Sequence, residues 1–157
     1  MWICRAGYKA KYFEYFIKNK KIYLAWEGFN IDLNDLMTVQ DIRDLVSKEM
    51  GSDNHTSISN WSGQLIAFRD GMCVDDYVVI PNANSHTYTL AKIAGDYTFE
   101  KESLIGLHHS RRISLIKSET SKEAFTQNLR YSMGAYRTVF KAKEEEKILD
   151  AFQKWNK

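Results

Sequence analysis

Residues 60 to 81, NWSGQLIAFRDGMCVDDYVVIP, change from a helical to a strand pattern within a few positions. Apolar residues recur at steps of three and four from Ile58 through Trp61 and Leu65 to Phe68, which predicts one buried face of a helix. The sequence Arg-Asp-Gly ends that pattern, and the β-branched run DYVVIP predicts a strand soon after it. The chain must therefore fold so that this helix leads without a linker into a sheet.

The other segments predict an alternation of strands and helices before this block and hairpins after it. Before the block we expect a strand at 2–6, a helix with Tyr12, Phe13, Phe16 and Ile17 on one face, a strand at 22–26, and a helix that begins at a capping-box-like Thr38-Val-Gln-Asp41. After it we expect hairpin strands at 76–81 and 86–97, a strand at 109–117, a helical stretch near 121–130, a short strand at 136–142, and a last helix with Ile148, Leu149, Phe152 and Trp155 on one face. This order predicts an α+β fold with a mixed, strongly curved sheet or small barrel flanked by helices.

Length and composition indicate a single domain over residues 1–157. The chain is 44% hydrophobic and 13% aromatic with one proline, as expected for a well-packed domain rather than a disordered one. It lacks an apolar run of about 18 residues, so we expect neither a membrane span nor a signal peptide, and a cytoplasmic location. Cys4 and Cys73 are expected as reduced thiols.

Charge is distributed unevenly along the chain. Residues 1–25 carry six basic and one acidic side chain, residues 26–102 carry five and thirteen, and residues 103–157 carry eleven and six. A fold that brings the two basic ends together would create one positive face suited to a nucleic acid. The alternative is an ordinary solvated surface.

Motifs of catalytic and cofactor sites are missing from the sequence. The phosphate-binding patterns G-x-x-x-x-G-K-[ST] and G-x-G-x-x-G are absent. His108 and His109 would point to opposite faces of a strand, so we expect a surface or loop role rather than a shared metal ion. Asp75 and Asp76 precede a strand at a position where a turn favours Asp. We expect no catalytic residue, no metal and no cofactor.

Several segments in chain order resemble a known family: MWICRAG, IYLAWEG, NWSGQLIAFRDGMCVDDYVVIP, YTLAKIAGDYTF, HHSRRISLI and SMGAYRTVF. Together they resemble the amino-terminal domain of Mrr-like, modification-dependent restriction endonucleases, which belongs to the EVE/YTH-like branch of the PUA superfamily. The likeness covers residues 1 to 140, and its most specific piece is the helix-to-strand block. It implies a β-barrel flanked by helices that accepts one flipped nucleobase, often a modified one, in an aromatic-lined pocket.

The resemblance also implies positions for the base pocket. Trp26 looks like the stacking tryptophan that follows the second strand in YTH-type pockets, and Arg5-Ala6-Gly7 falls where the first strand ends at the pocket rim. Glu27 departs from the small hydroxyl residue usual beside that tryptophan; it either accepts a hydrogen bond from a base amine or blocks the methyl-reading mode. Trp61 falls where EVE-type domains carry a tryptophan, with core packing as the alternative.

Tyr97 and Phe99 are expected to form the second wall of the aromatic cage, with packing at the end of the barrel as the alternative. For Trp26 the alternative is a strand tryptophan half-buried against a helix. Whichever holds, a flipped base needs at least two ring faces, because extrusion costs a few kcal/mol and stacking returns about 1 to 3 kcal/mol per base.

Phosphate contacts must then supply most of the affinity. Arg111 and Arg112 alternate on a strand, so one of them is expected to contact phosphate. Lys9 and Lys11 are expected to do the same near the start of the first helix, with solvated lysines as the alternative.

The leading hypothesis is a DNA-binding specificity domain of a restriction or phage-defence system that flips a modified base and targets a nuclease in another domain or subunit. One alternative is an RNA-binding PUA-type module, which would need the 2′-hydroxyl. Another is a nucleotide-sensing or protein-interaction domain of a defence system.

Overall fold

The computed structural model describes residues 1–35 and 38–156. Its strands are β1 (Trp2–Cys4), β2 (Lys21–Tyr23), β3 (Tyr77–Asn82), β4 (Thr87–Ile93), β5 (Thr98–Phe99), β6 (His109–Ser121) and β7 (Val139–Lys141). Its α-helices are α1 (Phe13–Asn19), α2 (Val39–Met50), α3 (His55–Ile66), α4 (Gln127–Ser132) and α5 (Glu145–Lys154). Four shorter helical turns are η1 (Tyr8–Ala10), η2 (Leu33–Asp35), η3 (Ala67–Gly71) and η4 (Lys122–Ala124).

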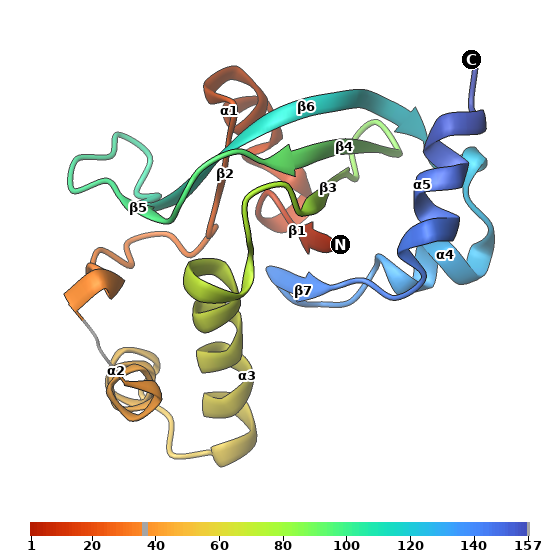
Figure 1. Cartoon of the computed structure of the whole chain (residues 1–157). Coiled ribbons are helices and arrows are strands. Elements are labelled where there is room, and N and C mark those ends of the chain that lie inside the picture. The colour runs from red at the N-terminus through yellow and green to blue at the C-terminus, as the bar shows by residue number, and fades with distance from the viewer. Residues whose placement is uncertain (36–37, 157) are drawn as a thin grey trace.

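The strands form one mixed, strongly curved sheet, so the predicted fold class is confirmed. Its order is β2-β6-β4-β3-β1-β7, with β5 paired to β6. β1 runs parallel to β3, whereas the other pairs are antiparallel. In Figure 1 the sheet curls so that β6 and β4 pass above β7, with α4 and α5 beside one end and α2 and α3 below.

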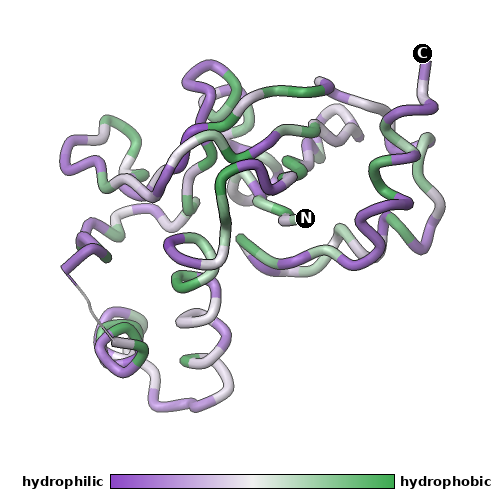
Figure 2. Tube along the Cα trace, viewed as in Figure 1, coloured by the Kyte–Doolittle hydropathy of each residue, from purple (hydrophilic) through white to green (hydrophobic). Residues whose placement is uncertain are grey.

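Helices bury both faces of the sheet, as β1 illustrates. Trp2 and Cys4 belong to a core cluster that α1, α2 and α3 cover, whereas Ile3 belongs to a second cluster covered by α4 and α5. This alternation follows the two-residue period of a strand. In Figure 2 the colour alternates between green and purple around α2 and α5, as expected for helices that bury one face.

β1 and β7, which come from the amino-terminal and carboxy-terminal parts of the sequence, lie side by side in the sheet. β1 pairs antiparallel with β7 in the register Ile3 to Phe140, and the amide N–H of Ala142 donates to the Met1 carbonyl over 3.0 Å. The amino-terminal ammonium also bonds Glu145 of α5 over 3.1 Å. In the described ranges, none of the helices is both long and apolar enough to cross a membrane.

The predicted capping box and the hairpin are both confirmed. The Thr38 side chain accepts from the Asp41 amide, the Asp41 carboxylate accepts from the Thr38 amide, and α2 follows directly. In the hairpin, Asn82 pairs with Thr87 across the predicted turn. Cys4 is buried and Cys73 exposed, and both are free thiols.

The ends of β2 and β4 differ from the predictions. β2 ends at Tyr23 instead of residue 26, because the Trp26 amide turns back to the Leu24 carbonyl over 2.8 Å. β4 ends at Ile93 instead of residue 97, and one further bond to β6 follows it, from the Ala94 amide to the Arg112 carbonyl over 2.8 Å. Residues 98–99 then form β5, which was not predicted as a separate strand.

The junction from α3 to β3 depends on Arg111 of β6. α3 continues into η3, which contains the predicted stop Arg-Asp-Gly, and the chain then leaves the helix. The buried Arg111 guanidinium donates to the carbonyls of Phe68, within η3, and Met72, just after it, and to the Gly95 carbonyl over 2.9 and 3.0 Å. One side chain thus binds the helix end, the following loop and the turn after β4 together.

Replacement of Arg111 by Met should lower the free energy of unfolding by on the order of 3 kcal/mol, because three buried carbonyls lose their donors. Urea denaturation followed by circular dichroism measures the loss. Arg112→Met, at the neighbouring exposed position, is the matched control and should change stability by less than about 0.5 kcal/mol. Equal losses in the two variants would show that Arg111 has no such role.

Candidate nucleic-acid interface

The paired ends of β1 and β7 bring Arg5 and Trp26 to the same place. The Arg5 amide donates to the Thr138 carbonyl over 2.8 Å, directly beyond the last β1–β7 register pair, Cys4 with Val139. The indole N–H of Trp26 donates to the Thr138 hydroxyl over 3.0 Å. Two residues that the resemblance assigned to one pocket rim are therefore neighbours, joined through Thr138.

Trp26 and Trp61 are both half-buried against the core. The Trp26 ring meets Phe29 edge-on, with centroids 5.9 Å apart at 90°. Trp61 packs against the same core cluster from α3, as its helical spacing allowed. The Trp26 ring is thus held by Phe29 on one side and by its hydrogen bond to Thr138 on the other.

Glu27 and Gly7 meet at Tyr12. The Glu27 carboxylate accepts from the Tyr12 hydroxyl and from the Lys11 ammonium, the latter over 3.2 Å. Gly7 has φ of 81°, and a Cβ there would lie 2.9 Å from the Tyr12 ring. Gly7 therefore lets the chain turn closely over Tyr12, while Glu27 holds Lys11 near the same turn.

Tyr97 does not face Trp26, so the predicted second wall of an aromatic cage is wrong for this residue. Phe29 and His109 lie between the two rings: Phe29 is 5.9 Å from Trp26, His109 is 5.1 Å from Phe29, and Tyr97 stacks on His109 at 5.8 Å. The end of the sheet is filled here by the domain's own side chains. A preformed slot for one flat base between Trp26 and Tyr97 is therefore excluded.

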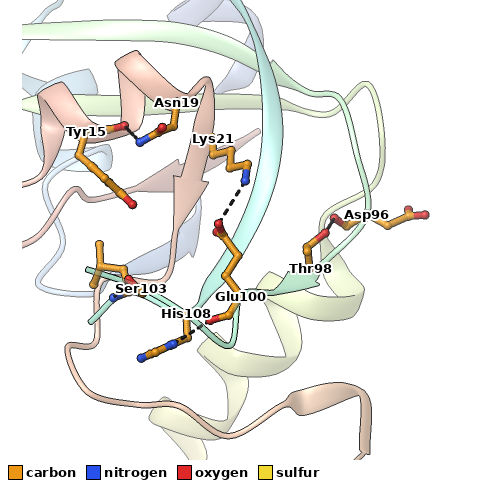
Figure 3. Close-up of polar contacts among 9 residues, drawn as sticks. Tyr15, Asn19, Lys21, Asp96, Thr98, Glu100, Ser103 and His108 are labelled. Carbon is orange, nitrogen blue, oxygen red and sulfur yellow. Dashed lines mark hydrogen bonds and ion pairs between the residues drawn. The ribbon is translucent and has the colours of Figure 1, made fainter. Parts of the chain in front are cut away.

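Phe99 and His108 pack on each other beside β5, with ring centroids 6.0 Å apart. Phe99 also packs on His109, with ring centroids 5.5 Å apart, as the alternative of packing at the end of the sheet predicts. His108 points toward the backbone of Glu100, whose carbonyl is 2.8 Å from Nδ1, and Glu100 pairs with Lys21 of β2 over 3.3 Å (Figure 3). The Phe99 ring of β5 and the backbone of Glu100 thus cover His108, which is buried.

His109 is fully buried in a hydrogen-bond chain. Its Nε2 is 2.9 Å from the Phe29 carbonyl, and its Nδ1 is 2.6 Å from the Tyr97 hydroxyl, which accepts from the Leu33 amide. His109 is therefore a neutral imidazole that donates from Nε2 and accepts at Nδ1. Burial lowers the pKa of His109 to about 4, and burial raises the pKa of Tyr97.

The predicted surface position is wrong for both histidines, because both are buried. His108 does lie in the loop before β6, whereas His109 is the first residue of that strand. In residues 1–35 and 38–156, no group of three His, Cys, Asp or Glu side chains is arranged to hold a metal ion. The turn role of the Asp75-Asp76 pair is confirmed: Asp76 accepts from the Cys73 amide over 2.9 Å and from the Trp2 indole over 3.0 Å.

Arg111 and Arg112 alternate as predicted, but a phosphate contact by Arg111 is wrong. Its side chain is 2% exposed and its donors are occupied by backbone carbonyls. Arg112 faces outward and crosses close to Gly95. Of the two arginines, Arg112 is the one that remains accessible to a ligand.

Two exposed tyrosines were missed in the sequence and lie at the same end of the β1–β7 pair. Tyr8, four residues after β1 ends, is 75% exposed, and Tyr136, three residues before β7 begins, is 95% exposed. The Arg5 guanidinium lies 5.5 Å from the Tyr136 ring centroid, and the Lys9 ammonium lies 5.4 Å from that of Tyr8. We call Arg5, Tyr8, Lys9, Lys11 and Tyr136 the tyrosine–cation rim.

Two features of the sequence could have indicated this rim. Tyr8 and Tyr136 stand outside the apolar faces of the predicted helices, and each has a basic residue beside it, Lys9 and Arg137. The rim combines aromatic faces with three cations, a chemistry that suits stacked bases and their phosphates.

The depressed pKa of His109 predicts a loss of stability in acid. The unfolded state takes up the proton near the ordinary pKa of 6.5 and the folded state only near 4, so stability is full above 6.5 and falls as the pH drops toward 4. Between pH 7 and pH 5 this one group should cost about 2 kcal/mol. Urea denaturation at both pH values measures the loss.

His109→Gln should remove this part of the pH dependence, whereas His55→Gln, at an exposed position, should keep it. An unchanged acid loss in His109→Gln would contradict a buried neutral His109.

Comparison with known proteins gave one family match. A model of the family described as "Domain of unknown function (DUF8426)" matches residues 2–143. No curated protein and no solved structure matched the chain. The family match includes every strand of the sheet and the tyrosine–cation rim, and it ends before α5. The resemblance to EVE/YTH-like domains stays a prediction.

Proposed function

The chain belongs to the DUF8426 family, and we propose that this domain binds nucleic acid through the tyrosine–cation rim. The observation that carries the proposal is the pairing of two exposed tyrosines with cations at the joined ends of the chain. Stacking of one base on an aromatic ring is worth about 1 to 3 kcal/mol. Because Arg5 covers one face of the Tyr136 ring while the side chain is 95% exposed, the other face is open to a base.

The cations of the rim supply the phosphate contacts in this proposal. Lys9 and Lys11 lie on the exposed turn around η1, one on either side of buried Ala10, and Lys11 is held there by Glu27. Each contact with a phosphate releases bound counterions, so affinity should fall steeply with salt. The pairing of Lys11 with Glu27 reduces the positive charge on that side, which leaves Arg5 and Lys9 as the stronger contacts.

The proposed ligand is DNA with one base displaced from its helix, the base being a modified one. The sequence resemblance to EVE/YTH-like domains and the curved sheet flanked by helices support this choice. Since Phe29 and His109 fill the space between Trp26 and Tyr97, the displaced base would stack at the surface on Tyr136 or Tyr8. Trp26 does not contact the base in this proposal. Its hydrogen bond to Thr138 instead fixes the segment before β7, which contains Tyr136.

The proposed role is recognition without catalysis, as the specificity domain of a restriction or defence system. Support comes from the chemistry of the rim, which offers cations and phenols; the neighbouring carboxylate, Glu27, is bonded to Tyr12 and Lys11. The nuclease would lie in another domain or subunit.

Alanine substitution of the tyrosines tests the proposal. Tyr136→Ala and Tyr8→Ala should each weaken binding to a fluorescent oligonucleotide by about 5- to 150-fold, the equivalent of losing one stacked base. Tyr131→Ala is the matched control, because Tyr131 is 71% exposed but lies on α4. Fluorescence anisotropy gives the affinities, and circular dichroism checks the fold.

The same titration identifies the ligand. The titration compares three kinds of ligand. They are DNA duplexes with and without N6-methyladenine, 5-methylcytosine or hydroxymethylcytosine, RNA of the same sequence, and free mononucleotides. Tighter binding of one modified duplex supports DNA-base recognition, tighter binding of RNA identifies an RNA-binding module, and equal affinity for mononucleotides a nucleotide sensor. Weak, salt-insensitive binding to every arm, or equal effects of Tyr136→Ala and Tyr131→Ala, would refute the rim.

A further inference from the structure

A groove of about 280 Å³, lined by both polar and apolar side chains, lies between α3 and β7, next to the tyrosine–cation rim. Gln64 joins its two sides, since its side-chain carbonyl accepts from the amides of Thr138 and Val139 over 2.8 and 3.2 Å. Gly63 also lines the groove, and a Cβ built on it meets no atom within 4 Å. The groove is therefore held in shape by one buried amide and is open along the helix.

The charge of this groove is entirely positive among the described residues that line it. Arg137, two residues before β7, and Lys141, the last residue of β7, flank it, and no carboxylate belongs to its lining. The Asp76 carboxylate, which accepts from the Trp2 indole, interacts electrostatically with Lys141 from outside the groove. Within the part of the chain that the structure describes, neither cation forms an ion pair; Lys141 lies over the Trp2 ring at 5.7 Å. The hollow between α4 and α5 differs, because Glu144, Glu146 and Asp150 line it together with lysines.

Besides the two cations, the groove has a neutral hydrogen-bond donor, the side-chain NH₂ group of Asn60. The Gln64 side-chain NH₂ group donates to the side-chain oxygen Oδ1 of Asn60 over 3.1 Å. Since that oxygen is occupied, Asn60 has its NH₂ group left to offer a ligand in the groove. A site of one guanidinium, one ammonium and an amide donor suits a ligand that carries negative charge and only acceptor oxygens.

We propose that this groove binds the phosphodiester backbone of the nucleic acid whose bases stack on the rim. This inference rests on the proposed function and extends it by naming the path of the strand. Arg137 and Thr138 follow Tyr136 directly in the sequence. A nucleic-acid strand with one base stacked on Tyr136 would therefore continue along β7 toward Lys141. The groove thereby adds two phosphate contacts that no sequence motif indicated.

The first test changes charge in the groove without changing size. Gly63→Glu and Gly63→Gln place side chains of equal length where a Cβ meets open space, so both variants should fold. Gly63→Glu should weaken binding to a fluorescent single-stranded oligonucleotide at least about 10-fold more than Gly63→Gln at low salt, and the gap should shrink as salt screens it. Equal affinities in the two variants would overturn the phosphate site.

The second test counts phosphate contacts. The double variant R137Q/K141Q should reduce the slope of log affinity against log salt by about 1.4 for single-stranded DNA, two contacts at about 0.7 each. The control K48Q/K101Q removes the same charge from exposed positions on α2 and the loop after β5. A slope change no larger than that of the control would overturn the proposal.

The experiments distinguish a failure of the groove proposal from a failure of the proposed function. If Tyr136→Ala weakens binding while the groove variants match their controls, the groove is wrong and the proposed function stands. If the wild-type protein binds no oligonucleotide, the proposed function fails, and thymidine 5′-monophosphate titrated against the Asn60 side-chain NMR signals decides the groove alone. A saturable shift that Gly63→Glu abolishes then supports an anion site, and the absence of a shift refutes it.

Discussion

The pairing of β1 with β7 is the constraint on which the site depends. It places residues 2–4 against residues 139–141, so segments from the two basic ends of the chain share one edge of the sheet. The Arg5 amide extends the pairing to Thr138, and Thr138 in turn accepts from the Trp26 indole. Tyr8 and Tyr136 leave this pair at the same end, which is why two tyrosines so distant in sequence belong to one surface. Without the pairing, the rim would have no common support.

The edge that β7 would otherwise expose is covered from α3. The Gln64 side chain accepts from two successive β7 amides, which replaces the partner strand that an edge lacks. The same contact fixes the distance between α3 and β7 and so shapes the groove with Arg137 and Lys141. At the C-terminal end of the same helix, buried Arg111 holds the exit of α3 to the turn after β4. A buried cation and a buried amide thus position both ends of the helix-to-strand block.

Local sequence pattern predicted the elements well, because helical and strand periods and the Thr38 capping box depend on neighbours in the chain. It could not decide matters set by distant contacts. Because side chains alternate along a strand, the sequence shows that Arg111 and Arg112 face opposite ways. Only the folded sheet determines that Arg111 is the one that faces inward. In the same way His109 is buried because the loop at Phe29 and the ring of Tyr97 close over it. The proposed base cage failed for that reason, since Phe29 and His109 separate two rings that the sequence placed together.

The site that remains combines surface stacking with phosphate contacts instead of an enclosed slot. Such a surface requires little rearrangement before a base binds, but it also offers few buried polar groups to select one base over another. Mapping of backbone amide shifts by NMR during titration with an oligonucleotide tests this account most directly. The account predicts that the largest shifts fall at residues 5–11 and 135–141. Shifts concentrated on α4 and α5, with those two segments unchanged, would contradict it.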